Sequence, residues 1–232
     1  MKSTALFASL LWVSLASAAA VAVPMSAPVV PAIAAFPVPE ITAAADSDTE
    51  NQLSGPCRNV TFIFARGTNE DGNVGARVGP PLIADLRAAL GTDGIAAQGV
   101  DYDASVLGYL EGGSPSGITT MTGLINTAAK QCPDTKIVIS GYSQGAQLVH
   151  KAAAKLTAAV TARVVAVAIF GDPERVGTTA STLPPVGKVP AALVDSFCHV
   201  GDIICTGEGG ATEHLDYDEN APAASAFILG LL

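Results

Sequence analysis

Hydrophobic residues beyond the first quarter of the chain gather into short runs separated by longer amphipathic segments. The apolar runs predict buried strands at Val60–Ala65, Lys136–Gly141, Val164–Phe170 and Leu193–Val200. Segments with helical spacing lie between them, at Pro80–Leu90, Thr119–Lys130 and Gln144–Ala159. Strands that are apolar on both faces and alternate with helices are typical of a parallel sheet covered on both sides. We therefore predict an α/β fold, a three-layer sandwich with a mostly parallel central sheet covered by helices.

The N-terminal pattern is different and indicates an export signal. Residues 4–23 carry no charge, follow Lys2, and are most apolar over Leu6–Leu15 before becoming small and alanine-rich. A membrane anchor is the alternative, since a stretch of this length could just span a bilayer. The strongly apolar part is short and no basic cluster follows it, which favours a signal peptide over residues 1–18.

The next segment, residues 19–55, is rich in proline and alanine and then becomes acidic. It shows neither the helical nor the strand period, and its prolines forbid long helices. We interpret it as a propeptide or linker; the alternative is an extension packed on the domain. The folded catalytic domain is then expected over residues 56–232.

Composition and charge narrow the class of protein. Of 232 residues, 49% are hydrophobic, which excludes disorder throughout the chain. The net charge is −9, and no run of lysine or arginine is present to neutralise phosphates. Nucleic acid is therefore not an expected partner.

Four cysteines in a chain that carries an export signal predict two disulfide bonds. Three pairings are possible, and proximity favours Cys198–Cys205, which leaves Cys57–Cys132. A zinc site is the alternative, but there is no C-x-x-C pair and His199 lacks suitably spaced partners. We expect no metal site.

The strongest chemical signal is the G-x-S-x-G motif from Gly141 to Gly145, with Ser143 at its centre. An apolar strand precedes the motif and a helix follows it, which is the context of a nucleophile elbow. The turn would project the Ser143 hydroxyl above the sheet and point the backbone N–H of Gln144 at a forming oxyanion.

A serine nucleophile needs a base, and the chain has three histidines. His150 lies two helical turns beyond Ser143, too far to reach its hydroxyl, and is expected on the surface or partly packed. His199 lies at a strand end beside a cysteine, where a structural role is expected. His214 remains, in a loop near the C-terminus, and gives the order serine, acid, histidine of this hydrolase class.

The acid that orients the base should lie between Ser143 and His214. The candidates are Asp172, Glu174, Asp195, Asp202 and Glu208. Asp202 is favoured because the short Cys198–Cys205 span would restrain its loop, with Asp172 as the second choice.

Four separated motifs, FIFARGTNEDGNVG, GYSQGAQ, CHVGDIICTG and EHLDY, resemble those of the fungal cutinase family. These are secreted serine esterases of the α/β-hydrolase type, and the resemblance extends from Cys57 to about Leu229. It implies a catalytic triad of Ser143, Asp202 and His214. It also implies an oxyanion hole from the backbone N–H groups of Thr68 and Gln144, with the Thr68 hydroxyl as a further donor, and it supports the favoured disulfide pairing.

The chain departs from this resemblance in one loop. Related cutinases tend to carry an apolar loop before the catalytic histidine, whereas Glu208–Glu213 is polar here. This difference suggests weaker binding to waxy or polymeric surfaces. Val106, Leu107 and Leu215 remain as candidates for an apolar cleft, although ordinary packing explains them equally well.

We therefore expect a secreted, extracellular, monomeric carboxylic-ester hydrolase, a cutinase acting on cutin-like polyester, that needs no cofactor and does not insert stably into membranes. An acetylxylan esterase is the alternative among enzymes, because it shares the elbow motif and a similar fold. A secreted surface-binding protein that keeps the fold without activity is the alternative outside enzymes.

Overall fold

The computed structural model describes residues 47–178 and 183–232. The predicted signal peptide, residues 1–18, and the predicted linker up to residue 46 lie outside this part of the chain. Within it, no helix is both long enough and apolar enough to cross a bilayer.

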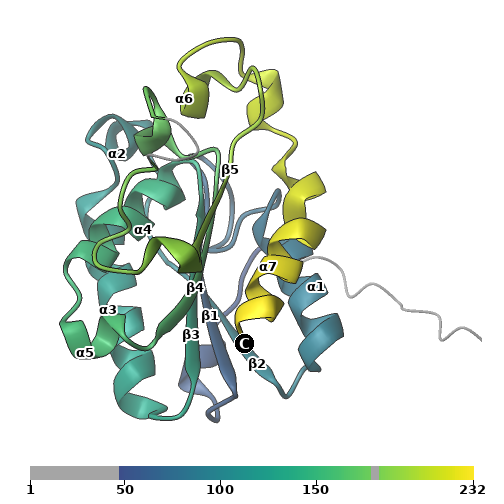
Figure 1. Cartoon of the computed structure of the whole chain (residues 1–232), viewed down its shortest axis with the longest axis vertical. Helices are drawn as coiled ribbons and strands as arrows, with labels where there is room; N and C mark the ends of the chain where they lie inside the picture. Colours follow the sequence, from purple (N-terminus) through teal and green to yellow (C-terminus); the bar gives the residue numbers. More distant parts are fainter. Residues whose placement is uncertain (1–46, 179–182) are drawn as a thin grey trace, which may run out of the picture. The chain divides into compact units, whose positions relative to one another are not determined.

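A five-stranded sheet forms the centre of the domain, with every neighbouring pair of strands parallel (Figure 1). The strand order is β2-β1-β3-β4-β5. The strands are β1 (Val60–Ala65), β2 (Ile95–Gly99), β3 (Lys136–Tyr142), β4 (Val164–Phe170) and β5 (Val194–Phe197). Nearly every residue of the three middle strands is buried, which is why both faces of these strands are apolar in the sequence.

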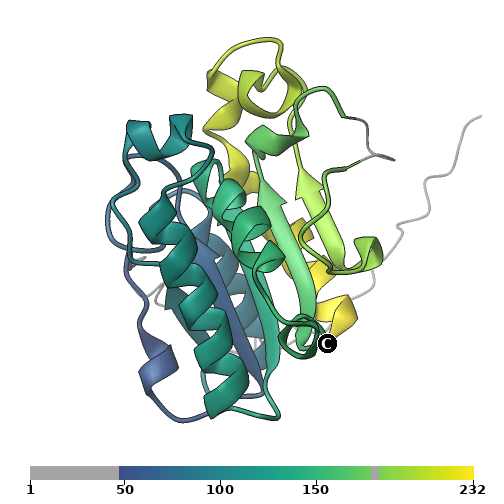
Figure 2. The same ribbon diagram turned by 90° about the vertical axis from the view of Figure 1, so that its left-hand side faces the viewer.

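Helices cover both faces of the sheet and complete three layers, which confirms the predicted α/β fold. Helices α3 and α4 pack together on one face, and α1 and α7 on the other (Figures 1 and 2). The helices are α1 (Gly79–Leu90), α2 (Val106–Leu110), α3 (Pro115–Gln131), α4 (Gln144–Ala154), α5 (Ala158–Thr161), α6 (Ile203–Thr206) and α7 (Ala221–Leu231).

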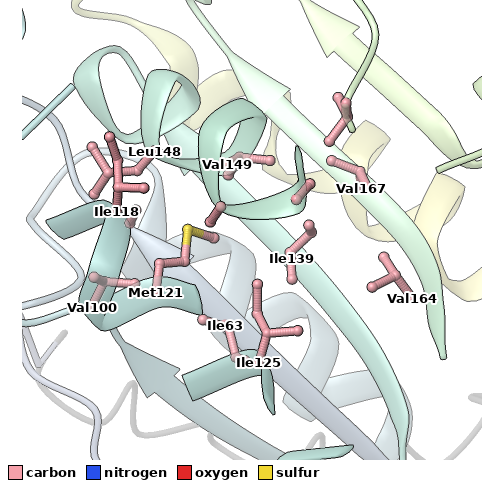
Figure 3. Packing of buried hydrophobic residues seen from close by; sticks show 14 of the residues in the cluster. Ile63, Val100, Ile118, Met121, Ile125, Ile139, Leu148, Val149, Val164 and Val167 are labelled. Atoms are coloured by element: carbon pink, nitrogen blue, oxygen red, sulfur yellow. The ribbon is translucent and has the colours of Figure 1, made fainter. Parts of the chain in front are cut away.

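The core between the sheet and helices α3 and α4 is built mainly from aliphatic side chains, with one methionine and Tyr102 (Figure 3). These side chains are excluded from solvent, among them Ile63, Met121, Ile125, Ile139 and Val149. Burial of each such side chain contributes about 1.5–3 kcal/mol. This packing fixes α4, and with it the turn that holds Ser143, against the middle of the sheet.

Several elements differ from the prediction: helix α3 begins at Pro115 rather than Thr119, and helix α7 was not predicted. Strand β2 is missing from the prediction, because IAAQG contains only three apolar residues and no alternation. Helix α4 ends at Ala154 rather than Ala159, since the Thr157 hydroxyl accepts a hydrogen bond from Val160 and begins a separate short helix. The predicted strand Leu193–Val200 is shortened to β5, and the residues after Phe197 turn toward α6.

Residues 47–55, the last part of the predicted linker, pack on the domain. Asn51 forms an antiparallel bridge with Gln98 of β2, and the Glu50 carbonyl accepts from the Gly99 N–H. The Glu50 carboxylate accepts two hydrogen bonds from the Arg87 guanidinium, at 2.6 and 2.7 Å. This segment therefore covers the free edge of the sheet, an edge that otherwise invites pairing with another chain.

The structure contains two disulfide bonds, Cys57–Cys132 and Cys198–Cys205, and no free cysteine among the residues it describes. The first closes a loop of 75 residues and ties the start of the domain to the end of α3. In the chain-entropy model such a loop contributes on the order of 4 kcal/mol. The second spans seven residues and holds the segment between β5 and α6.

Candidate active site

Ser143 lies in the sharp turn between β3 and α4. Its backbone angles, φ 56° and ψ −118°, are rare for a residue other than glycine. A side chain on Gly141 would collide with the backbone of Gly145, and one on Gly145 would collide with the carbonyl of Ala65. The two glycines therefore let strand and helix approach closely enough to hold Ser143 in the strained turn typical of a nucleophile elbow.

Ser143, His214 and Asp202 form one line of hydrogen bonds. The Ser143 Oγ lies 2.9 Å from His214 Nε2, and His214 Nδ1 lies 2.8 Å from Asp202 Oδ2. Asp202 is fully buried, and Ser143 and His214 are 6% and 9% exposed. With the Nδ1 proton directed at the carboxylate, Nε2 can accept the hydrogen of the serine hydroxyl. This geometry allows an imidazole to activate a serine.

The Asp202 carboxylate is held by three donors. Its Oδ1 accepts from the Ile204 N–H at the start of α6, at 2.8 Å. Its Oδ2 accepts from His214 and also from the Tyr217 hydroxyl, at 2.7 Å. The Cys198–Cys205 disulfide spans this position. Fixed donors on both oxygens keep the carboxylate turned toward the imidazole.

Tyr217 is a site residue that the sequence analysis missed. Its hydroxyl donates to Asp202 and accepts from the His199 N–H at 2.9 Å, and its ring is fully buried. Burial raises the pKa of Tyr217, and the nearby Asp202 carboxylate raises it further against the lowering effect of the His199 N–H. The hydroxyl therefore stays protonated and donates. Its place in EHLDY, three residues after His214, was the available signal.

Tyr217→Phe removes one donor from the Asp202 carboxylate and leaves the partly buried His199 N–H without its acceptor. We expect kcat on a short p-nitrophenyl ester to fall about 10-fold, because a hydrogen bond to a charged group contributes about 1.5–3 kcal/mol. The free energy of unfolding in urea should fall by about 1–3 kcal/mol. An unchanged kcat would show that Tyr217 does not help to hold Asp202.

His214 and His199 are both held by contacts outside the line of hydrogen bonds from Ser143 to Asp202. The Tyr142 hydroxyl donates to the His214 carbonyl at 2.6 Å, and the two rings lie 5.1 Å apart. The nitrogens of His199 lie 2.9 Å from the Glu213 carbonyl and 2.7 Å from Asn220 Oδ1. His199 thus anchors the segment that carries His214. This is a structural role, as the sequence analysis expected for His199.

The backbone N–H groups of Thr68 and Gln144 are free to donate. Gln144 is the first residue of α4, where a helix has no internal acceptor for its N–H. Within residues 47–178 and 183–232, neither N–H takes part in a hydrogen bond. Thr68 lines the same cavity as Ser143 and His214.

A cavity of about 430 Å³ opens above Ser143 and His214. Its lining combines polar and apolar side chains: Thr68, Asn69, Glu70, Arg77, Val106, Tyr109, Tyr142, Ser143, Ile204, His214 and Leu215. Of the predicted cleft residues, Val106 and Leu215 are present. Leu107 lies on the same short helix as Val106 but outside the lining, and it is 65% exposed.

Large apolar side chains are exposed on the elements that border this cavity. They are Val106, Leu107 and Leu110 on α2, Ile203 on α6, Val200 just before α6, and Leu215. Helices α2 and α6 both lie at the end of the sheet where Ser143 is found (Figure 1). The polar loop Glu208–Glu213 is exposed throughout, so the apolar surface here comes from its neighbours.

His150 and Asp172 form a second buried His–Asp pair, which corrects the expectation that His150 lies on the surface or is only partly packed. His150 is 7% exposed and Asp172 is fully buried. The Nε2 of His150 lies 2.9 Å from Asp172 Oδ2, and its Nδ1 lies 3.1 Å from the Pro185 carbonyl. Asp172 also begins a short helical turn by accepting from the Glu174 N–H. The second choice for the catalytic acid is therefore occupied elsewhere.

Both ring nitrogens of His150 face acceptors, so the doubly protonated imidazolium fits this environment. Burial lowers the pKa of His150, but the Asp172 hydrogen bond and charge, with smaller effects from Pro185 and Glu174, raise it above the ordinary value. A raised pKa in the folded state stabilises the fold at low pH, and this stabilisation disappears as pH rises through the raised pKa.

His150→Gln tests this pair, because glutamine stays neutral at every pH. We expect the loss in free energy of unfolding, measured in urea, to be largest below about pH 6 and to shrink above the raised pKa. The same loss at every pH from about 5 to about 9 would mean that His150 does not bind a proton on folding.

Among the described residues, no cluster of three or more His, Cys, Asp or Glu side chains could hold a metal ion.

Comparisons with known proteins agree with this geometry. Residues 56–232 match the family model described as "Cutinase". The chain is 49% identical over 190 residues to a cutinase from Blumeria hordei, covering 81% of this chain and 78% of that protein. It is 47% identical over 175 residues to a cutinase from Botryotinia fuckeliana, covering 74% of this chain and 82% of that protein.

Solved structures of a cutinase and of an acetylxylan esterase also match this chain. A Trichoderma reesei cutinase in complex with a phosphonate inhibitor matches with a TM-score of 0.71 and 42% identity, over 80% of each chain. The catalytic core domain of a Trichoderma reesei acetylxylan esterase matches with a TM-score of 0.61 over 76% of this chain and all of that one. At 22% identity, the second likeness concerns the fold alone. This chain belongs to the cutinase family and is a serine esterase.

Proposed function

We propose that this chain is an exported cutinase that hydrolyses ester bonds with Ser143 as nucleophile, His214 as general base and Asp202 as the orienting acid. The observation that carries the proposal is the hydrogen-bonded line from Ser143 through His214 to Asp202, on the floor of an open cavity. The resemblance to an inhibitor-bound cutinase, at 42% identity, supports the same assignment.

In the first half of the reaction, Ser143 Oγ attacks the ester carbonyl carbon while His214 Nε2 takes the hydroxyl proton. The Asp202 carboxylate stabilises the imidazolium that forms. The oxyanion of the tetrahedral intermediate accepts hydrogen bonds from the N–H groups of Thr68 and Gln144. The intermediate then collapses as His214 gives its proton to the leaving alcohol.

In the second half, water attacks the acyl-enzyme with His214 again as the base. The same oxyanion donors stabilise the second intermediate, and the acid is released as Ser143 regains its proton. The proposed reaction uses side chains and backbone groups of this chain and needs no cofactor.

A cutin-like polyester is the proposed substrate. The exposed apolar residues of α2 and α6 favour contact with fatty acyl chains, which a sugar-bound acetyl group does not offer. The chain is also much more similar to cutinases than to the acetylxylan esterase, at 49% against 22% identity. An acetylxylan esterase is the second candidate.

A profile of hydrolysis against acyl chain length separates the two candidates. We expect turnover of p-nitrophenyl esters from short to medium chain length and release of hydroxy acids from cutin. Strict preference for acetyl esters, with no release from cutin, would identify an acetylxylan esterase. The Ser143→Ala variant is the control for hydrolysis by contaminants.

The cellular setting is part of the proposal. An N-terminal signal over residues 1–18 and the two disulfide bonds support export to an oxidising, extracellular environment. The net charge of −9 disfavours nucleic acid as a partner. We propose that the mature enzyme acts as a monomer.

A further inference from the structure

One short sequence motif has no part in the proposed ester chemistry. Asn59, Val60 and Thr61 form N-x-T, the acceptor sequence for N-linked glycosylation in exported proteins. Asn59 is the only asparagine of the chain that has a serine or threonine two positions later. The motif enters the sheet at the start of β1, so its asparagine and its threonine lie in different surroundings.

Asn59 lies on the surface, one residue before β1. Its carbonyl accepts from the Lys136 N–H at 2.8 Å, which ties the main chain to β3. Its side-chain amide forms a hydrogen bond with none of the residues that the structure describes. The neighbouring turns, residues 91–93 before β2 and residues 133–134 before β3, are exposed as well. A glycan on the Asn59 side chain would therefore extend into solvent without displacing a contact.

Thr61 has the opposite surroundings. Only 1% of its surface is exposed, and its hydroxyl lies 2.9 Å from the Thr135 hydroxyl. Its main chain is paired with Ala96 of β2 on one side and Ile137 of β3 on the other. The acceptor motif includes this hydroxyl, and a transferase cannot reach it inside the folded sheet. A glycan on Asn59 must therefore be attached before β1 pairs with β3.

The order of synthesis leaves an interval for this transfer. Thr135 follows Thr61 by 74 residues, and Cys132 follows its disulfide partner Cys57 by 75. At about 5–20 residues per second, the β3 partners of the motif are made about 4–15 s after it. Strand β2 is made sooner, but two strands alone are at best marginally stable. The motif is thus accessible while the chain enters the export pathway.

The motif lies at the end of the sheet opposite Ser143. Val60, the first residue of β1, pairs with Lys136, the first residue of β3, and Ser143 directly follows the last residue of β3. At about 3.3 Å per residue, β3 spans about 23 Å. The exposed apolar residues of α2 and α6 lie at the Ser143 end (Figure 1). A polar glycan on Asn59 therefore leaves them free to contact the substrate.

We propose that Asn59 carries an N-linked glycan, transferred to the nascent chain before β1 pairs with β3. The inference rests on the export that is part of the proposed function and is independent of its ester chemistry. In the transfer, Asn59 Nδ2 forms a bond to C1 of the first sugar of a lipid-linked oligosaccharide pyrophosphate. The bond from C1 to the pyrophosphate oxygen breaks, the lipid pyrophosphate leaves with the electron pair, and one Nδ2 proton passes to a base of the transferase.

Secretion of the full chain from a yeast host, followed by peptide mass spectrometry, tests the modification. We expect one N-linked glycan on the peptide that contains Asn59, and a peptide N-glycosidase should release it and leave aspartate. Asn59→Gln and Thr61→Val should both lack the glycan, whereas Thr61→Ser, the matched control, should keep it because serine retains the hydroxyl. A wild-type chain that reaches the medium without a glycan on Asn59 would overturn the proposal.

The order of events is tested with the full chain made in bacteria without a glycan. A purified transferase, supplied with the lipid-linked oligosaccharide, should modify Asn59 in the reduced and alkylated chain. The folded chain with both disulfides should take up no sugar, because its Thr61 hydroxyl is buried. Equal modification of the folded and the alkylated chain would contradict transfer before pairing of β1 with β3.

Enzymatic removal of the glycan should leave the hydrolysis of cutin and of a short p-nitrophenyl ester unchanged, since Asn59 is far from Ser143. Faster cutin hydrolysis after removal would contradict the placement of the glycan away from the apolar surface. Failure of the proposed function looks different, because a glycosylated chain would then not be labelled on Ser143 by a p-nitrophenyl phosphonate. A secreted chain that is labelled there but carries no glycan would overturn the present inference alone.

Discussion

Ser143→Ala is expected to lower kcat on short p-nitrophenyl esters by about 10⁶-fold, the loss seen when a serine hydrolase loses its nucleophile. The variant keeps the oxyanion donors and the cavity, so residual hydrolysis above the rate in water is expected from these groups. No other hydroxyl is hydrogen-bonded to His214 Nε2 among the described residues.

The fold of this variant should be nearly unaffected. The hydroxyl makes a hydrogen bond to His214, which contributes about 0.5–1.5 kcal/mol, so the unfolding temperature should change by no more than about 5 °C. Ser54→Ala is a matched control, because Ser54 is exposed and bonds only to the nearby Asn51 carbonyl. Turnover retained by pure Ser143→Ala would refute its role as nucleophile.

Asp202→Asn is expected to lower kcat by about 10⁴-fold while the fold is kept. Three donors converge on this carboxylate, from His214, Tyr217 and Ile204. An amide has one oxygen and one NH2 group, so at least one of the three donors must face the NH2 group. If the NH2 group of the introduced amide faces His214, Nδ1 of the imidazole becomes an acceptor and its proton moves to Nε2. A proton on Nε2 blocks the activation of Ser143.

Asp172→Asn is the matched control for this change. It alters the same kind of buried His–Asp contact on His150, which has no contact with Ser143. We expect it to lower the free energy of unfolding by about 3–5 kcal/mol, as breaking a buried ion pair does, with little effect on kcat below its unfolding temperature. Equal losses of kcat in the two variants would contradict the assignment of Asp202 as the acid.

The sheet and the nucleophile turn could be predicted because their signals are local. Strand β4 is a continuous apolar run, strand β1 is apolar except for Thr61, and the glycines at 141 and 145 flank Ser143 at fixed spacing. Both the close approach of the helix and the positive φ of Ser143 are consequences of that short motif. At this turn, the packing of strand and helix requires the same two glycines that define the sequence motif.

Other features could not be predicted, because they depend on contacts between distant segments. Strand β2 has too few apolar residues to be recognised, and it is buried because α1 packs on its face and residues 50–53 cover its edge. Residues 47–55 resemble a linker in sequence because their contacts are with distant residues: the backbone N–H groups of Glu50 and Leu53 donate to domain side chains, and the Gln52 side chain accepts from the Ala97 N–H.

The two His–Asp pairs likewise could not be assigned from the sequence, because each depends on contacts between distant segments. Asp172 and Asp202 both follow strands of the sheet, and sequence order alone favours neither of them. The structure separates them because His150 contacts one carboxylate and His214 the other. Tyr217 was missed for a related reason, as its partners are fixed by folding.

Covalent labelling with a p-nitrophenyl alkyl phosphonate tests the central claim most directly. The wild-type enzyme should release one equivalent of p-nitrophenol, lose its esterase activity, and carry one phosphonyl adduct that peptide mass spectrometry locates on Ser143. Ser143→Ala should take up no label under the same conditions. An adduct on a different residue, or an active and folded enzyme that takes up no label, would contradict the assignment of Ser143 as the nucleophile.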